Sequence, residues 1–224
     1  MSPSRLTSRR LRIVVLAAGF SARLGQPKAL ARIHGASVLD RTIRTLLPFR
    51  AAAGIIVVIP RRAVRYTLGF PRRSVAFVAN ADRATGLASS VRLGVRRARH
   101  SAGILLLPVD LVDLQHRDIA RLIARWCGAR RKVAARRVEA HAGAPLILPR
   151  YLYAHASNIA GDLGLRELVR RLPRDAVSLT DLPSAELDVD TPEDLERARR
   201  RRRPVQPRAF CTNRYPIAGS VKIY

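Results

Sequence analysis

The sequence predicts an α/β fold, in which a mostly parallel sheet is covered by helices on both faces in a three-layer, Rossmann-like arrangement. Short runs rich in leucine and β-branched residues alternate with segments of helical periodicity along most of the chain. These runs are almost continuously apolar, which is typical of strands buried on both faces. With 224 residues, 48% of them hydrophobic, the chain can bury such a core.

The first half of the chain is expected to supply the central strands and two crossover helices. Nearly continuous apolar runs predict the strands, at residues 11–17, 54–59, 75–79 and 103–109. The helices are predicted where apolar residues recur every three or four positions, at residues 37–48 and 89–99. This order is typical of βαβ units.

The second half shows a weaker version of the same pattern. Helical periodicity predicts helices at residues 115–126 and 165–172, and strand candidates lie at residues 132–136, 145–148, 176–180 and 186–189. A last helix is expected to begin at Thr191, whose hydroxyl can cap the first turn. Pro192 then occupies the first helical position, and Glu193 and Asp194 face the positive end of the helix dipole.

These elements divide the chain into one domain, at residues 11–198, and two basic ends. Residues 1–10 form a basic extension, and residues 199–224 form an arginine-rich tail without periodicity, which we expect to be disordered. The chain carries 42 Lys and Arg against 16 Asp and Glu, a net charge of +26. This charge favours an anionic partner but does not decide between a nucleic acid, a membrane surface and a phosphorylated small molecule.

Several classes of protein are excluded by composition. Two cysteines are too few for a disulfide framework, and neither has a second Cys or His at zinc-ligand spacing. No apolar run approaches the roughly 20 residues of a membrane span. The basic and then apolar residues 9–20 imitate an export signal, but they are better explained by a first strand that runs into a glycine turn. We therefore expect a cytoplasmic protein.

The most informative stretch for function is residues 16–28, LAAGFSARLGQPK, where the first predicted strand leads into a loop. Ligands of open α/β sheets bind at the carboxyl ends of strands. The small residues of the stretch let the backbone approach a ligand, and Arg23 and Lys28 supply two cations. The stretch therefore predicts a triphosphate site, with an ordinary strand-to-helix connection as the structural alternative.

Better-known motifs do not fit this stretch. A P-loop has four residues between its glycines, whereas five separate Gly19 from Gly25. The dinucleotide-binding pattern G-x-G-x-x-G would need glycine at Ser21, and the nucleophile elbow G-x-S-x-G would need it at Arg23. Ser21 is therefore not expected to be a catalytic nucleophile.

Three acidic residues at predicted strand ends are candidate metal ligands. Asp110 follows the buried run 104–109, and Asp188 and Asp190 precede the last helix. Carboxylates at one sheet edge can share a Mg²⁺ ion, although a turn-capping aspartate is the structural alternative for Asp110. Residues 86–90 form a turn into a helix, which can bind an anion or a base edge or can simply be a helix cap.

Residues 16–28 resemble the first motif of the nucleotidyltransferases of the molybdenum cofactor family, Leu-Ala-Ala/Gly-Gly-x-Ser-x-Arg-Met-Gly-x-x-Lys. At Ala18 and Pro27, the chain resembles the branch of this family that uses CTP. Four further blocks of the chain continue the resemblance, which covers residues 11–198: Asn80 with 86–95, 143–145, 161–166 and 188–195. Where the family usually has Asp-Gln/Met-Pro, this chain has Asp110 followed by Leu111 and Val112, which puts the contacts to the acceptor in doubt.

The resemblance implies a nucleotidyltransferase fold, an Mg²⁺-dependent cytidylyltransferase and a set of site residues. It implies catalytic roles for Arg23, Lys28 and Asp110, and metal binding by Asp110 and Asp190. The residues that it places at the nucleotide are Leu16, Ala17, Ala18, Gly19, Ser21, Arg23, Lys28, Asn80, Gly86 and Ser90. The reaction would join CMP from CTP to the terminal phosphate of molybdenum-bound molybdopterin, for delivery to a recipient molybdenum hydroxylase.

Three alternatives remain open. The first is a related nucleotidyltransferase that uses another NTP or a sugar or alditol phosphate as acceptor. The second is a nucleic-acid-binding protein, which the charge allows but the scarcity of aromatic residues, 5%, disfavours. The third is an inactive relative that acts as a chaperone for the cofactor.

Overall fold

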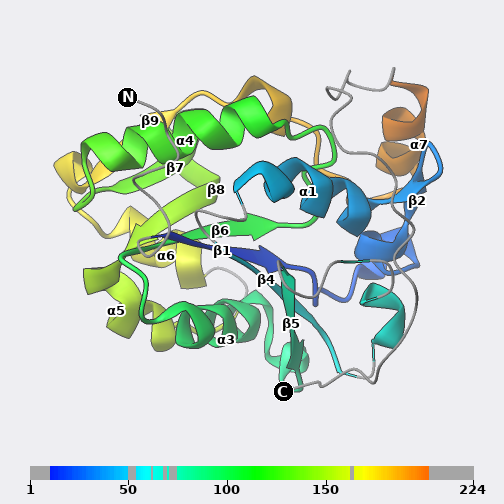
Figure 1. The fold of residues 1–224 in the computed structure, drawn as a ribbon, viewed down its shortest axis with the longest axis horizontal. Helices are drawn as coiled ribbons and strands as arrows, with labels where there is room; N and C mark the ends of the chain where they lie inside the picture. The colour runs from blue at the N-terminus through cyan, green and yellow to red at the C-terminus, as the bar shows by residue number, and fades with distance from the viewer. Residues whose placement is uncertain are drawn as a thin grey trace.

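In the computed structural model, the described residues are 11–49, 54–61, 63–67, 70, 75–161 and 164–201. They form a seven-stranded sheet in the order β5-β4-β1-β6-β8-β7-β9 and a separate hairpin of β2 and β3. Helices lie on both faces of the sheet (Figure 1), so the expected three-layer α/β fold is confirmed. The predicted N-terminal extension and residues 202–224 of the predicted tail lie outside the described residues.

Six of the seven strands run in the same direction. The parallel pairs are β1 with β4, β1 with β6, β4 with β5, and β7 with β9. Strand β8 alone is antiparallel to both of its neighbours. The bounds are β1 Leu11–Leu16, β4 Ile55–Pro60, β5 Val75–Asn80, β6 Gly103–Pro108, β7 Val133–Val138, β8 His141–Pro149 and β9 Val177–Thr180.

Each face of the sheet has its own hydrophobic core, because side chains alternate along the strands. In β1, Ile13 and Val15 belong to one core, and Val14 and Leu16 belong to the other. The first core is covered by α1 (Val38–Leu46), α4 (His116–Gly128) and α7 (Pro192–Arg200). The second is covered by α3 (Leu87–Ala98), α5 (Tyr153–Ser157) and α6 (Gly164–Arg170) (Figure 1).

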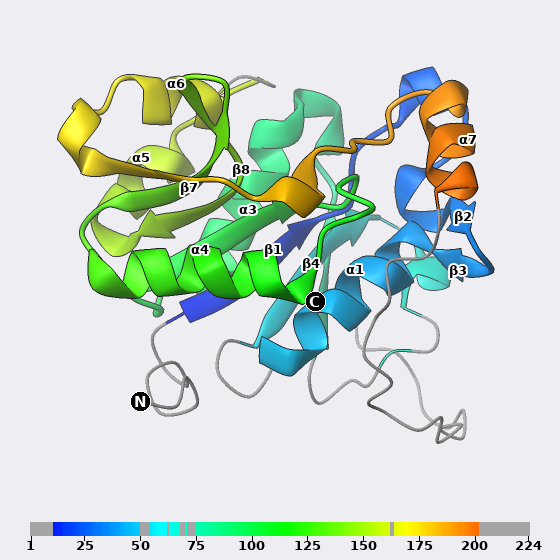
Figure 2. The same ribbon diagram turned by 90° about the horizontal axis from the view of Figure 1, so that it is seen from above.

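Two elements differ from the sequence-based expectation. The prediction of a strand at 186–189 is wrong, because Asp188 forms only an isolated bridge with Leu111 and the sheet ends at β9. The hairpin of β2 (Arg32–Ile33) and β3 (Ala36–Ser37) was not expected, because two-residue strands show no periodicity. The hairpin lies beside α7 (Figure 2), and the imidazole Nε2 of His34 is 2.7 Å from the carbonyl oxygen of Arg199.

The start of α7 agrees with the prediction. The Thr191 hydroxyl accepts a hydrogen bond from the backbone N–H of Asp194, and the Asp194 carboxylate accepts one from the backbone N–H of Thr191. The helix continues through Arg200, so the first two residues of the predicted tail are helical. Within the described ranges, no helix is long and apolar enough to span a bilayer.

Candidate active site

The loop that follows β1 is held in shape by its own polar groups. The Ser21 hydroxyl accepts a hydrogen bond of 2.9 Å from the backbone N–H of Lys28, and so closes the loop at its base. Ser21 and Gly25 adopt left-handed backbone conformations, with φ of 55° and 71°. A Cβ atom added to Gly19 would meet nothing within 4 Å, so open space adjoins the backbone there. A ligand can therefore approach this loop closely.

The first residues of the motif can contact a ligand only through their backbone. The side chains of Leu16, Ala17 and Ala18 are buried in the two cores, with exposed fractions of 7%, 3% and 1%. Their backbone is fixed by the neighbouring strands: the N–H of Ala17 donates to the carbonyl of Val58, and the N–H of Val109 donates to the carbonyl of Leu16. The strand end is thus a rigid support for the loop.

Four of the five charged residues singled out in the sequence meet in one cluster, and Asp188 forms none of its ion pairs. The ammonium group of Lys28 lies 3.4 Å from Oδ2 of Asp110 and also contacts Oδ1 of Asp190. The guanidinium group of Arg23 lies 2.7 Å from Oδ2 of Asp190. Residues from three distant parts of the chain therefore converge where β1 and β6 end.

The two aspartates are brought together by the backbone. Asp110 follows β6, and its carbonyl oxygen accepts a hydrogen bond of 3.2 Å from the N–H of Val189. The bridge between Leu111 and Asp188 extends this contact. On the other side of Asp190, the Asp194 carboxylate accepts a hydrogen bond of 3.1 Å from the Asp190 backbone N–H. The start of α7 therefore fixes the backbone that carries Asp190.

The crowding of carboxylates at this edge changes their acidity. Burial raises the pKa of Asp110, and the nearby Lys28 ammonium opposes that rise. Asp188 is exposed, but partial desolvation and then the charge of Asp110 raise its pKa to about 6. A cation bound beside these carboxylates would stabilise their charged forms.

The donor set at this edge suits a hard divalent cation. Within the described residues, no group of three His, Cys, Asp or Glu side chains is arranged to hold a metal ion by itself. Mg²⁺ is, however, commonly bound through one or two carboxylates together with substrate phosphates. Asp110 and Asp190 supply two carboxylates that already share the ammonium group of Lys28. These residues fit a metal ion that arrives together with a triphosphate.

A second polar cluster follows β5 at the same edge of the sheet. The buried side-chain amide of Asn80 donates hydrogen bonds to the hydroxyl groups of Ser89 and Ser90, at 2.8 and 3.0 Å. Gly86 precedes α3 with a φ of 87°, a conformation that favours glycine. Asn80 thus holds the start of α3 against the end of β5, which is a positioning role that the structure shows directly.

One cation near the aspartates was missed in the sequence. Arg136 is half-buried on β7, and its positive charge lowers the pKa of Asp188 against the effects that raise it. Its sequence neighbour Arg137 forms an exposed ion pair of 3.0 Å with Asp181. The basic composition of this strand was visible in the sequence, but an arginine-rich chain offers no pattern that separates one arginine from another.

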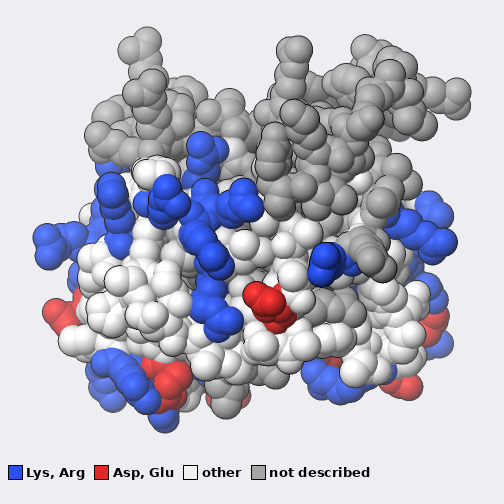
Figure 3. Space-filling view, turned by 90° about the horizontal axis from the view of Figure 1, so that it is seen from below, with Lys and Arg blue, Asp and Glu red and all other residues white. Residues whose placement is uncertain are grey.

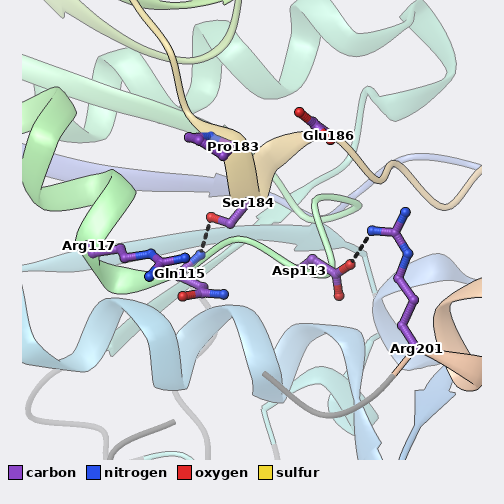
Figure 4. A pocket seen from close by; sticks show the side chains of 7 residues that line it. All are labelled: Asp113, Gln115, Arg117, Pro183, Ser184, Glu186 and Arg201. Carbon is purple, nitrogen blue, oxygen red and sulfur yellow. Dashed lines mark hydrogen bonds and ion pairs between the residues drawn. The ribbon is translucent and has the colours of Figure 1, made fainter. Parts of the chain in front are cut away.

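Two surface depressions border α7 and do not contain the Lys28 cluster. The smaller one, about 280 Å³, is lined by seven residues (Figure 4): Asp113, Gln115, Arg117, Pro183, Ser184, Glu186 and Arg201. The Ser184 hydroxyl accepts a hydrogen bond from the backbone N–H of Gln115. The backbone N–H of Ser184 donates to the buried carboxylate of Asp118 on α4. These bonds anchor the segment that leads to Asp188 and Asp190.

Comparisons with known proteins place this chain in a family. Residues 13–177 match the model of the MobA-like NTP transferase domain. A 2-C-methyl-D-erythritol 4-phosphate cytidylyltransferase from Rhodococcus opacus (strain B4) is 30% identical over 221 residues, covering 83% of this chain and 92% of the relative.

Solved structures agree with the match. The structure of Rv0371c from Mycobacterium tuberculosis H37Rv has a TM-score of 0.72 and 25% identity, with coverage of 86% of this chain and 99% of that one. A complex of Rv0371c with manganese has a TM-score of 0.68 and 24% identity, covering 84% and 97%. With three quarters of the chain matched by the family model and the sheet edge built as described, this chain belongs to the MobA-like NTP transferase family.

Proposed function

We propose that this protein is an Mg²⁺-dependent cytidylyltransferase, which transfers CMP from CTP to the terminal phosphate of molybdenum-bound molybdopterin. The products would be the cytosine dinucleotide form of the cofactor and pyrophosphate. The observation that carries the proposal is the cluster of Arg23, Lys28, Asp110 and Asp190, which joins two cations and two carboxylates at the carboxyl edge of the sheet.

Each member of the cluster has a role in this reaction. Arg23 and Lys28 would exchange their carboxylate partners for phosphate oxygens, and so bind and orient the triphosphate. The open backbone at Gly19 leaves space for the nucleotide. Leu16, Ala17, Ala18 and Ser21 would shape this loop, while Asn80, Gly86 and Ser90 would form the second polar cluster around the nucleotide.

The chemical step needs little covalent help from the protein. An oxygen of the acceptor phosphate forms a bond to the α-phosphorus of CTP, the bond from that phosphorus to the bridging oxygen breaks, and pyrophosphate leaves with the electron pair. A phosphate monoester has a second pKa of about 6, so the attacking oxygen is already mostly ionised and no general base is required. The cations of the site neutralise the charge that develops on the leaving group.

Asp110 and Asp190 would hold the metal ion, which would neutralise charge on the α-phosphate and on pyrophosphate when bound. The manganese complex of Rv0371c supports the choice of a divalent cation. We also propose a cytoplasmic location and delivery of the product to a molybdenum hydroxylase.

The proposal is tested by calorimetry with CTP, GTP and ATP in the presence of Mg²⁺, followed by pyrophosphate release with a panel of phosphorylated acceptors. We expect CTP to bind most tightly. Lys28→Ala should abolish binding, whereas Lys132→Ala, which changes an exposed lysine, should leave it unchanged. Equal pyrophosphate release from GTP and CTP would contradict the choice of cytidine, and a lack of binding to all three nucleotides would contradict the enzyme.

A second acceptor class is favoured by one specific finding. The cytidylyltransferase from Rhodococcus opacus acts, by its name, on an alditol phosphate and is 30% identical to this chain. We therefore include 2-C-methyl-D-erythritol 4-phosphate in the acceptor panel. Faster pyrophosphate release with this compound than with the pterin phosphate would show that the alditol phosphate, and not molybdopterin, is the preferred acceptor.

The basic surface offers the more remote alternative of nucleic-acid binding. Figure 3 shows Lys and Arg side chains gathered over one face of the molecule. The exposed basic residues of the chain include Arg96 and Arg97 on α3. Retention on heparin measures this property. If Lys28→Ala loses CTP binding but keeps its retention, nucleotide binding and polyanion binding are separate properties. An Asp110→Asn variant that keeps its cellular function would instead favour a cofactor chaperone.

A further inference from the structure

Two polar side chains at the carboxyl edge of the sheet have no role in the cluster described above. Arg136 is the fourth residue of β7, and Thr180 is the last residue of β9. The two strands are parallel, and these residues face each other in the register. Cross-strand partners in a sheet point to the same face, so the side chains of Arg136 and Thr180 leave the sheet on the same face.

Within the described residues, neither side chain has a hydrogen-bonding partner. The hydroxyl oxygen of Thr180 is buried and has no hydrogen-bonding partner in the described part of the chain. Within the same ranges, Arg136 makes no hydrogen bond or ion pair, although it is half-buried, whereas Arg137 is paired with Asp181. A buried polar group without a partner costs free energy, and such groups are common where a ligand completes the site.

The sheet directs this pair toward the aspartates. Along β7, Ala134 belongs to the core under α1, α4 and α7, while Val133 and Ala135 belong to the opposite core. By alternation, Arg136 lies on the same face as Ala134. Leu187 and Val189, which flank Asp188, belong to that same core. Arg136 and Thr180 therefore share both a face and an edge of the sheet with the segment that carries Asp188 and Asp190.

The pairing of β7 with β8 is irregular beside Arg136. The partner of Ala135 in β8 is Leu146, but the partner of Arg136 is Gly143, so two residues of β8 bulge out at this point. Gly143 has no side chain, and a Cβ atom there would come within 2.5 Å of the Val138 side chain. The Val138 side chain therefore leaves room only for glycine at this position of β8, which is paired with Arg136.

We propose that Arg136 and Thr180 form the binding site for the phosphate group of the acceptor substrate. This inference rests on the proposed nucleotidyl transfer, in which a second phosphate must approach the nucleotide. Arg23 and Lys28 bind the triphosphate on the β1 side of the aspartates, and the Arg136 pair binds the acceptor on the β7 side. A guanidinium and a hydroxyl donate hydrogen bonds to phosphate oxygens, so a bound phosphate would supply an acceptor for each group.

The test measures binding of inorganic phosphate to the full chain by calorimetry, with CTP and Mg²⁺ already saturating. We expect Arg136→Gln to weaken phosphate binding by about tenfold or more, because a hydrogen bond to a charged group is lost. Thr180→Val should weaken it by roughly threefold to tenfold. The matched control is Arg137→Gln, which removes the neighbouring, already paired arginine and should leave phosphate binding unchanged.

The inference and the proposed function fail in different ways. If the wild-type protein does not bind CTP, the proposed function fails. If it binds CTP but Arg136→Gln affects phosphate no more than Arg137→Gln does, or if the wild type binds no phosphate, the acceptor site is refuted. A loss of CTP affinity in Arg136→Gln, with phosphate binding intact, would also refute it, because Arg136 would then belong to the nucleotide. Thermal unfolding of each variant separates these results from misfolding.

Discussion

Replacing Asp194 with alanine should impair both the stability of α7 and the geometry of the aspartate cluster. One oxygen of Asp194 accepts hydrogen bonds from the backbone N–H groups of Asp190 and Thr191, at 3.1 and 3.0 Å, and from the Thr191 hydroxyl at 3.1 Å. Loss of such a cap costs about 0.5–2 kcal/mol, and loss of a negative charge at a helix start costs about 0.3–1 kcal/mol. We expect a total decrease in the free energy of unfolding of roughly 1–3 kcal/mol.

The pH dependence of this loss has a definite sign. The backbone N–H of Asp190 is the main group that holds the pKa of Asp194 below its usual range. A depressed pKa means that the charged form stabilises the fold above the pKa of the unfolded chain, and that this contribution is lost as the pH falls through the folded value. The difference between wild type and Asp194→Ala should therefore be complete at neutral pH and smaller in acid.

Urea unfolding followed by far-UV circular dichroism measures the stability, and the Mg²⁺ concentration for half-maximal pyrophosphate release measures the geometry. Asp194→Asn is the matched control, because it keeps an oxygen acceptor and should lose less in both assays. Glu193→Gln removes another first-turn charge and tests the dipole effect alone. Equal losses in Asp194→Ala and Asp194→Asn, or a loss that does not shrink in acid, would refute this reasoning.

Three further predictions follow from contacts in and around the site. Lys28→Met should bind Mn²⁺ more tightly than wild type when no nucleotide is present, because the ammonium shared by Asp110 and Asp190, the proposed metal ligands, is gone; calorimetry with MnCl₂ decides this. Asp188→Asn should raise the free energy of unfolding at neutral pH in EDTA, because the folded state raises the pKa of Asp188 from 3.8 to about 6 and so disfavours its charged form. This gain in stability should vanish as the pH falls to 3.8, and a gain that grew in acid would contradict the prediction. Gly94→Ala should lower the free energy of unfolding by about 1–3 kcal/mol, because the added Cβ would lie 2.5 Å from a methyl group of Val14. Urea unfolding measures this loss, and a variant more stable than wild type would show that α3 can move away from Val14 without cost.

The sequence predicted the central part of the fold well because that part is repetitive. The strands at 11–17, 54–59 and 103–109 are almost completely buried, so their composition alone marks them. The strand at 75–79 was also predicted to be central, but it forms an edge of the sheet and exposes Ala76. The direction of β8 was not predictable in this way. An apolar run shows that a strand is buried, but it contains no signal for whether the strand runs parallel or antiparallel to its neighbours.

The site was predicted where local rules apply and missed where they do not. The spacing of Arg23 and Lys28 in one loop and the cap at Thr191 are local patterns, and the structure places these residues beside Asp110 and Asp190. The roles assigned to them in nucleotide and metal binding stay predictions. Arg136 was missed because its position depends on the pairing of β7 with β9, which brings together residues more than forty positions apart.

The reversed direction of β8 bears on how this protein could change its substrate. Because β8 runs against β6 and β7, the turn that joins β7 to β8, at Glu139, projects from the carboxyl edge of the sheet, and both Glu139 and Ala140 are exposed. Insertions at an exposed hairpin tip leave the register of the paired strands intact. The hairpin can therefore lengthen or shorten in evolution while the loop after β1 keeps its conformation.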